Sequence, residues 1–129
     1  MNITSVLMVD DDANIRRIAQ LVLTRVVPWE VKLAASGNEA LAILQEFQPD
    51  LILLDVMMPG LDGPTTLSSI KQTYGEAAPP VIFMTAKALK SEVDFFKNLG
   101  SIGVITKPFD PKTLPEEIMS ICRQWRSVA

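Results

Sequence analysis

The feature that most constrains this chain is an alternation, along its whole length, between short apolar runs and longer segments with helical spacing. The short runs are rich in Val, Ile and Leu and are apolar almost throughout, which is typical of strands buried on both faces of a sheet. We predict strands at Ser5–Val9, Val31–Ala34, Leu51–Leu54, Val81–Met84 and Gly103–Ile105.

The segments between these runs repeat apolar residues at helical spacing, so that the apolar side chains share one face of a helix. The predicted stripes are Ile15–Leu23, Ala40–Phe47, Leu67–Tyr74, Val93–Leu99 and Leu114–Trp125. Strands that alternate with helices indicate parallel pairing, right-handed crossovers and helices on both faces of the sheet. The predicted fold class is α/β: a three-layer, doubly wound (βα)5 domain with a five-stranded parallel sheet.

Length and composition agree with this fold class. The 129 residues are 48% hydrophobic and 21% charged, as expected for one globular domain. We predict a single domain over residues 1–129, with its core at about residues 4–126. Apolar runs stay well short of the ~18 residues of a membrane span, and Met1–Thr4 lacks the basic start of a signal peptide. We therefore expect a cytoplasmic protein that does not interact with membranes.

Composition also excludes several kinds of chemistry. The chain has no histidine, which excludes Ser-His-Asp and Cys-His catalysis and the His-based zinc motifs. Its one cysteine, Cys122, cannot form an internal disulfide and lies on the apolar stripe of the last helix, where we interpret it as inert core. A net charge of −3 makes nucleic acid an unlikely partner, and we predict none.

Polar residues follow four of the five predicted strands directly. Asp10, Asp11 and Asp12 follow the first strand and Asp55 follows the third; the fourth runs into Thr85-Ala86, and the fifth into Thr106, Lys107 and Pro108. Ligands of such sheets bind at the carboxyl ends of the strands, so these side chains should meet in one pocket.

The chemistry of this set favours phosphoryl transfer. The repulsion between clustered carboxylates is relieved by a hard cation such as Mg²⁺, which takes oxygen ligands. An aspartate can act as a nucleophile toward phosphorus, and the transfer depends mainly on positioning and charge neutralisation. Asp12 has a second interpretation as the N-cap of the following helix.

Four stretches carry a family resemblance: Val9–Asp12, Leu53–Gly60, Met84–Ala86 and Lys107–Phe109. In this order and spacing the chain resembles the receiver domain of two-component response regulators, and the resemblance covers essentially its whole length. It implies a flavodoxin-like or CheY-like fold with strand order 2-1-3-4-5. It also implies a phosphoacceptor switch, rather than a turnover enzyme, that catalyses part of its own phosphorylation and dephosphorylation.

The resemblance implies a role for each matching residue. Asp55 is the expected phosphoacceptor. Asp10, Asp11, Asp55 and the backbone carbonyl of Met57 are the expected Mg²⁺ site, with Asp10 reaching the metal through water. Thr85, Ala86 and Lys107 are the expected phosphate-binding and switch residues, and a cis peptide is expected at Lys107–Pro108.

The implied partners are proteins. The expected phosphodonor is a histidine kinase or a histidine phosphotransfer protein, and the target is an unknown protein that binds in trans. The expected binding face is formed by the fourth helix, the fifth strand and the fifth helix, and it is also the expected route to a homodimer. On that face, either one of Phe95 and Phe96 is core and the other is half-covered by a neighbouring helix, or one of the two rings is an exposed anchor for a dimer mate or a target.

One position departs from the family pattern, and two others occupy positions that set how long the phosphorylated state lasts. Val104 stands where the family often carries Tyr or Phe, so we expect signalling to depend mainly on Thr85 and the 86–92 loop. Met57 and Lys87 occupy the two positions that usually tune the lifetime of the acyl phosphate, and we expect Met57 to slow its hydrolysis.

Other motifs fit less well. Asp10-x-Asp12-x-Asn14 resembles the start of an EF-hand loop, but Ile15 and Leu21 stand where that loop requires Gly and Glu. A flavin site of the flavodoxin type would place a phosphate-binding loop after the first strand, where the acidic triplet would repel the phosphate. We predict a stand-alone receiver; the alternative is a phosphorylation-independent adaptor with the same fold, and an aspartate-nucleophile phosphatase ranks far lower.

Overall fold

The structure is a computed structural model that describes residues 3–128. Its strands are β1 (Ser5–Val9), β2 (Glu30–Ala34), β3 (Leu51–Asp55), β4 (Val81–Thr85) and β5 (Gly103–Thr106). Its helices are α1 (Ala13–Arg25), α2 (Gly37–Leu44), α3 (Gly63–Tyr74), α4 (Lys90–Asn98) and α5 (Leu114–Val128), and a 3-10 turn, η1, covers Gly75–Ala77. The predicted alternation of strands and helices is confirmed.

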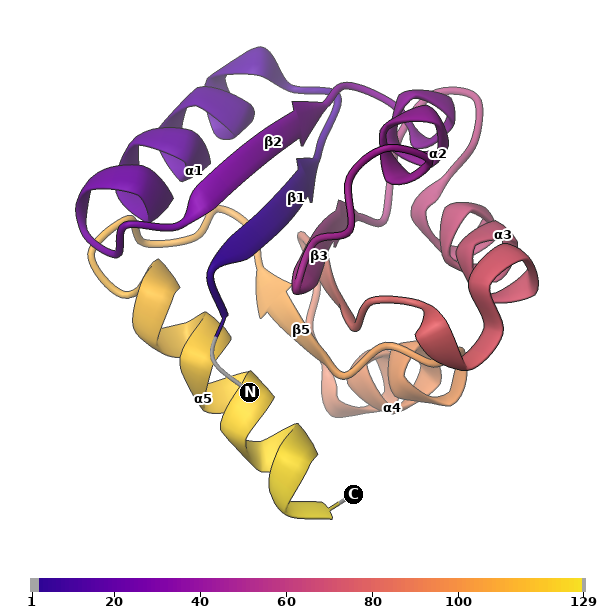
Figure 1. The fold of residues 1–129 in the computed structure, drawn as a ribbon. Coiled ribbons are helices and arrows are strands. Elements are labelled where there is room, and N and C mark those ends of the chain that lie inside the picture. The colour runs from indigo at the N-terminus through magenta and orange to yellow at the C-terminus, as the bar shows by residue number, and fades with distance from the viewer. Residues whose placement is uncertain (1–2, 129) are drawn as a thin grey trace.

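The strands form one parallel sheet in the order β2-β1-β3-β4-β5, as predicted (Figure 1). β3, β4 and β5 each extend one residue beyond the predicted apolar run, because ladder pairing continues through the polar residue that follows. Asp55 pairs with Met84, and Thr85 pairs with Thr106. These polar residues are therefore fixed by the sheet itself rather than by a loop.

Alternation along each strand divides the core between two faces. Val6 and Met8 face α1 and α5, whereas Leu7 and Val9 face α2, α3 and α4. Figure 1 shows α1 and α5 on one side of the sheet and the other three helices opposite. Because β1 and β3 are covered on both sides, nearly every residue in them is buried, which explains why their sequences are apolar throughout.

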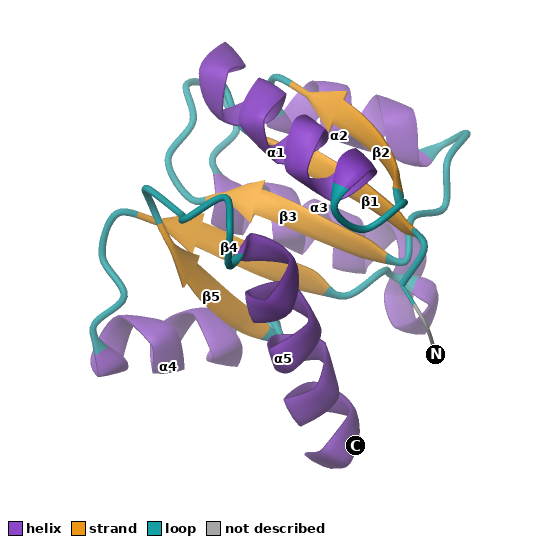
Figure 2. Cartoon of the chain, turned by 90° about the vertical axis from the view of Figure 1, so that its left-hand side faces the viewer, coloured by secondary structure: helices purple, strands orange, loops and turns teal. Residues whose placement is uncertain are grey.

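The carboxyl ends of the strands lie together at one edge of the sheet, with the arrowheads pointing the same way (Figure 2). β1 and β3 are adjacent and in register, with Val9 opposite Leu54. The residues that follow, Asp10 and Asp55, are therefore neighbours across the ladder.

Candidate functional site

Asp10 is held at the end of β1 by its backbone. Its N–H donates to the carbonyl of Ala34 at 3.1 Å, and its carbonyl accepts from Nη1 of Arg16 at 2.7 Å. Its side chain has no exposed surface and accepts from the N–H of Asp12 at 2.9 Å. A buried carboxylate in this position needs a compensating positive charge.

The other two aspartates of the triplet play different structural parts. Asp11 is exposed. Asp12 is the N-cap of α1, since its Oδ1 accepts from the N–H of Asn14 at 2.8 Å and of Ile15 at 3.4 Å. The capping interpretation of Asp12 is thus confirmed, and it leaves Asp10 and Asp11 as the members of the triplet available to a site.

Asp55 is the last residue of β3 and is only 3% exposed. Its Oδ1 accepts from the N–H of Met57 at 3.4 Å. The start of α3 comes close to this strand end: a Cβ on Gly63 would lie 2.8 Å from Cα of Val56, and the Gly63 N–H donates to the Val56 carbonyl at 2.9 Å. Glycine at position 63 therefore lets α3 begin directly beside Asp55.

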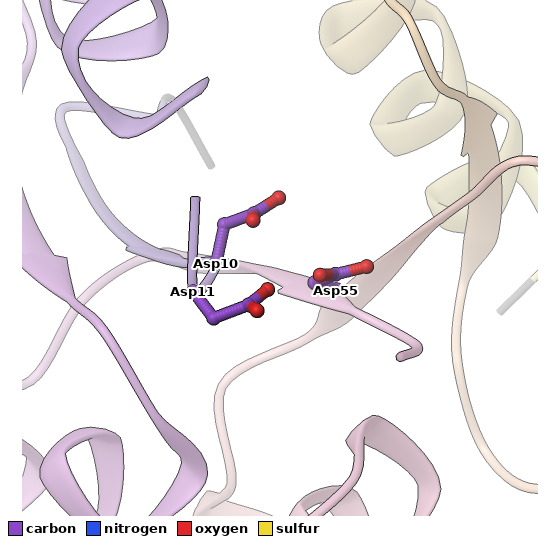
Figure 3. Close-up of side chains that lie close together, drawn as sticks. All are labelled: Asp10, Asp11 and Asp55. Carbon is purple, nitrogen blue, oxygen red and sulfur yellow. The ribbon is translucent and has the colours of Figure 1, made fainter. Parts of the chain in front are cut away.

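Three carboxylates meet at this edge. Asp10, Asp11 and Asp55 each offer an oxygen that lies within 4.8 Å of the others. Figure 3 shows Asp10 and Asp11 projecting from consecutive positions beside Asp55. An all-oxygen set from carboxylates, two buried and one open to solvent, matches the ligands that Mg²⁺ prefers and leaves room for water or phosphate oxygens.

Lys107 brings the compensating charge from the end of β5. Its Nζ lies 2.9 Å from Oδ2 of Asp10 and 3.3 Å from Oδ1 of Asp55. The contact with Asp10 is the shorter of the two. The ammonium therefore bridges the two buried carboxylates.

The electrostatics of the site follow from this arrangement. Burial and the negative charge of Asp10 raise the pKa of Asp55 to about 6, against the opposing effect of the Lys107 ammonium. Burial acts to lower the pKa of Lys107, but the hydrogen bonds and charges of Asp10 and Asp55 together outweigh it, so the pKa of Lys107 is raised. Negative charge at Asp55 is under-compensated, which is the condition that a bound cation relieves.

Thr85 and Ala86 lie next to this cluster. Thr85 ends β4 and is 8% exposed; its Oγ1 accepts from the N–H of Lys87 at 3.3 Å, and its carbonyl accepts from the N–H of Lys107 at 2.7 Å. Ala86 is exposed directly after the strand. The Lys107–Pro108 peptide bond is cis. The residues expected to form the metal and phosphate site thus lie at the carboxyl end of the sheet.

Two positions near the site have distinct surroundings. Val104 is opposite Phe83 in the sheet and is half-buried against the α2–α3–α4 side of the core. Met57 is 78% exposed.

Of the two phenylalanines in α4, Phe96 is buried, with its ring centroid 5.1 Å from that of Phe83, whereas Phe95 is 56% exposed. The structure therefore favours the exposed-ring interpretation for Phe95.

Sequence reasoning missed Arg16, whose guanidinium binds the carbonyl of Asp10. Arg16 is the fourth residue of α1, and nothing in its sequence context distinguishes it from Arg17, which is exposed. The contact depends on how α1 packs against the end of β1, which spacing alone does not predict.

Comparison with known proteins agrees with the geometry. A family model described as the response regulator receiver domain matches residues 6–119. The chain belongs to the response regulator receiver domain family. It is a receiver domain of the two-component systems, and receiver domains are signalling switches that are generally not classed as enzymes.

Individual relatives of this receiver domain support the assignment. It is 38% identical over 119 residues to the "Probable transcriptional regulator ycf27" of Porphyridium aerugineum, covering 92% of this chain and 48% of that protein. It is 36% identical over 123 residues to the transcriptional regulatory protein ResD of Bacillus subtilis, covering 95% of this chain and 50% of that protein. The receiver domain spans about half the length of the curated relatives that it matches.

Among solved structures, the chemotaxis response regulator CheY4 of Vibrio cholerae superposes with a TM-score of 0.84 at 30% identity, covering 93% of this chain and 99% of that one. A CheY-like receiver domain protein from Methanospirillum hungatei gives a TM-score of 0.81 at 26% identity, covering 99% of this chain and 100% of that one.

Within residues 3–128, no helix is both long enough and apolar enough to span a bilayer.

Proposed function

We propose that this receiver domain accepts a phosphoryl group on Asp55 in a Mg²⁺-dependent reaction and thereby changes its affinity for a protein bound in trans. The observation that carries the proposal is the position of Asp55: it is buried, adjacent to Asp10 and Asp11, and 3.3 Å from the ammonium of Lys107. One nucleophilic carboxylate with a cation on one side and a metal site on the other is the arrangement that phosphoryl transfer needs.

The metal site would use the carboxylates of Asp10, Asp11 and Asp55 and the backbone carbonyl of Met57. Mg²⁺ bound there would neutralise charge on the transferring group. Asp10, the most buried of the set, holds Lys107 directly, which is consistent with a contact to the metal through water. The three carboxylates fit the metal by ligand type and by their mutual distance.

The transfer step conserves atoms and charge. An oxygen of Asp55 attacks the phosphorus of a phosphohistidine on a kinase or phosphotransfer protein. The P–O bond to Asp55 forms as the P–N bond breaks; the electron pair stays on that ring nitrogen, and because the other ring nitrogen of the phosphohistidine carries a proton, neutral imidazole leaves. In this reaction Lys107 pairs with the transferred group, and the Thr85 hydroxyl and the Ala86 N–H donate to its oxygens. The chain supplies these groups itself, so it catalyses part of its own phosphorylation and dephosphorylation.

The proposed readout is a change at the face formed by α4, β5 and α5. Phe95, exposed on α4, is the aromatic anchor of that face, where it can contact a protein target or a second copy of the chain.

A net charge of −3 favours protein partners over nucleic acid, and a single unpaired cysteine agrees with a cytoplasmic setting. We propose that residues 1–129 form a single receiver domain with its core at about 4–126.

The experiment is intact mass spectrometry after incubation with acetyl phosphate. We expect a gain of one phosphoryl group that requires Mg²⁺ and is absent in Asp55→Asn. Asp62→Asn is the matched control, because Asp62 is an exposed aspartate that caps α3 and lies outside the cluster. No gain in a folded protein, with acetyl phosphate or with a histidine kinase, would support the phosphorylation-independent adaptor instead.

A further inference from the structure

The turn between β1 and α1 carries two of the three clustered carboxylates, and they are held in different ways. The Asp10 side chain is buried and is fixed by the Lys107 ammonium and the Asp12 N–H, each at 2.9 Å. The Asp11 side chain is exposed and forms no hydrogen bond within residues 3–128. The position of the Asp11 carboxylate therefore depends on its backbone.

The backbone at this turn lies where a β-ladder ends. In a parallel pair, the N–H and the carbonyl of one residue bond to two successive peptide groups of the neighbouring strand. The Asp10 N–H makes its bond, to the Ala34 carbonyl at 3.1 Å, and the matching donor for the Asp10 carbonyl would be the Ser36 N–H. However, β2 ends at Ala34, and Ser36 is the N-cap of α2. Among the described residues, the ladder bond to the Asp10 carbonyl is absent.

The side chain of Arg16 supplies the donor instead. Its Nη1 donates to the Asp10 carbonyl at 2.7 Å, and its backbone N–H donates to the Asp12 carbonyl at 3.1 Å, so Arg16 is bound to the turn twice. The Asp10 carbonyl belongs to the peptide group that joins Asp10 to Asp11. Because a peptide group is planar, a bond that holds its oxygen also holds the nitrogen and Cα of Asp11. Arg16 thus fixes the direction in which Asp11 leaves the strand.

The charge of Arg16 would act in the opposite sense to its geometry. Its acceptor is a neutral carbonyl, and its guanidinium forms no ion pair within the described part of the chain. A cation near three carboxylates repels a metal ion that they would bind. Removing Arg16 should therefore tighten metal binding if its charge dominates, and weaken metal binding if its hydrogen bond dominates.

We propose that Arg16 is a positioning residue for the Mg²⁺ site: through the Asp10 carbonyl, it orients the peptide that places the Asp11 carboxylate beside Asp55 (Figure 3). The inference rests on the proposed function, because it concerns the same metal site. It adds to that site a residue of α1 that is not itself a ligand of the metal.

The test is a Mg²⁺ titration of the full chain labelled with ¹⁵N, followed through the amides of Asp11 and Met57. Arg16→Met removes the donor and keeps an unbranched side chain. We expect its dissociation constant for Mg²⁺ to be about 3- to 10-fold higher, as for loss of one hydrogen bond. Arg16→Lys, which keeps a donor and the charge, should recover part of the lost affinity.

Phosphorylation by acetyl phosphate gives a second measurement. In Arg16→Met, the rate at limiting Mg²⁺ should fall by the same factor as the affinity. At saturating Mg²⁺ the rate should return close to that of the unmodified chain, because Arg16 acts on the placement of a metal ligand and does not contact the reacting atoms.

Two controls separate positioning from charge and from stability. Arg17→Met removes the same charge from the next residue, which is exposed and has no side-chain hydrogen bond within residues 3–128. It should bind Mg²⁺ as tightly as the unmodified chain, or more tightly. Asp50→Asn weakens the contacts of Asp50 with Thr4 just before β3, at the other end of the strand from Asp55, and should leave the affinity for Mg²⁺ unchanged.

The outcomes distinguish this inference from the proposed function. If Arg16→Met binds Mg²⁺ as tightly as Arg17→Met, or if Asp50→Asn loses as much affinity as Arg16→Met, Arg16 is not a positioning residue and the proposed function stands. If the unmodified chain binds no Mg²⁺, the proposed metal site is wrong, and the role of Arg16 is overturned with it.

Discussion

Lys107 Nζ lies 2.9 Å from Oδ2 of Asp10, and the Asp10 side chain has no exposed surface. This is the shorter of the two contacts of the ammonium, since the distance to Asp55 is 3.3 Å. Lys107 is therefore anchored by Asp10 rather than by Asp55, the proposed phosphoacceptor. A group introduced on Asp55 would meet an ammonium already held in place.

The anchoring predicts a stability effect for Lys107→Met. The substitution leaves Asp10 and Asp55 buried without a cation, so the free energy of unfolding without Mg²⁺ should fall by about 2–4 kcal/mol. Added Mg²⁺ should restore part of the lost free energy of unfolding, because it replaces the missing positive charge. Urea denaturation with and without Mg²⁺ measures both effects. Lys90→Met is the control: Lys90 pairs with Asp94 on the surface, and its change should stay below about 1 kcal/mol. Equal stability of Lys107→Met and the unmodified chain would contradict the prediction.

Mg²⁺ itself should stabilise the fold. A ligand that binds only the native state at about 100 times its dissociation constant adds about 2.7 kcal/mol. Asp11→Asn should reduce the Mg²⁺-induced rise in melting temperature and leave the metal-free melting temperature nearly unchanged, because Asp11 is exposed. Asp94→Asn removes the same charge away from the site and should respond to Mg²⁺ like the unmodified chain. An identical Mg²⁺ response in Asp11→Asn would remove Asp11 from the metal site.

Met57 should slow the loss of the phosphoryl group. Its side chain is 78% exposed, and its N–H donates to Asp55, so an apolar group stands beside the reacting atoms. In Met57→Asn, a polar side chain admits and orients water, and hydrolysis should be about five-fold faster, which corresponds to about 1 kcal/mol of barrier. Decay of the phosphorylated mass over time gives the rate. A rate that is unchanged or slower would count against this role.

Thr85 should carry the structural response, because Val104 has no aromatic ring to rearrange. Thr85→Ala should reduce the amide shifts that acetyl phosphate with Mg²⁺ induces in α4 and β5. Val104→Tyr should enlarge or redirect them, since a ring then adjoins Phe83 across the ladder. These shifts are read directly from two-dimensional NMR spectra. If neither substitution altered them, the switch would depend on other residues.

Asp50 gives a pH dependence unrelated to the site. Its Oδ2 accepts from the Thr4 N–H at 2.8 Å and from the Ser5 N–H at 3.2 Å. The hydrogen bond from the Thr4 backbone is the largest of the effects that lower the pKa of Asp50 below its ordinary value of 3.8, against the opposing effect of burial. A lowered carboxyl pKa stabilises the fold above the ordinary value and loses that contribution as pH falls through the folded-state value.

Asp50→Asn should therefore be less stable than the unmodified chain at neutral pH, by about 1 kcal/mol. The difference should narrow as pH falls below 3.8 and through the lower pKa of the folded state, where the unmodified Asp50 also becomes neutral. Urea midpoints measured across this pH range give the comparison. A constant difference at every pH would mean that the charge of Asp50 does not contribute.

Much of the site was predictable because strand ends are easy to locate in sequence. An apolar run that stops at Asp10 or at Asp55 marks the edge of a parallel sheet, and the topology then brings the two together. The sequence pattern placed the end of β3 one residue early, because an aspartate interrupts an apolar run even when ladder pairing continues through it.

Other features depend on tertiary packing that no local pattern encodes. Adjacent positions on a helix point about 100° apart, so the sequence indicates only that Phe95 and Phe96 cannot both be core. The contact with Phe83 decides that Phe96 is the buried one. In the sequence Ser101 resembles an ordinary loop serine, and only the structure shows that it is buried with an unpartnered hydroxyl.

The register between β1 and β3, with Val9 opposite Leu54, has a consequence for how such a chain can vary. Substitutions that keep volume leave the ladder intact, but inserting one residue within either strand would turn every following side chain to the opposite face. It would also displace one carboxylate by about 3.3 Å relative to the other. Natural or engineered length changes should therefore accumulate in the loops at the amino ends of the strands, and the lengths of β1 and β3 should stay fixed wherever the two aspartates act together.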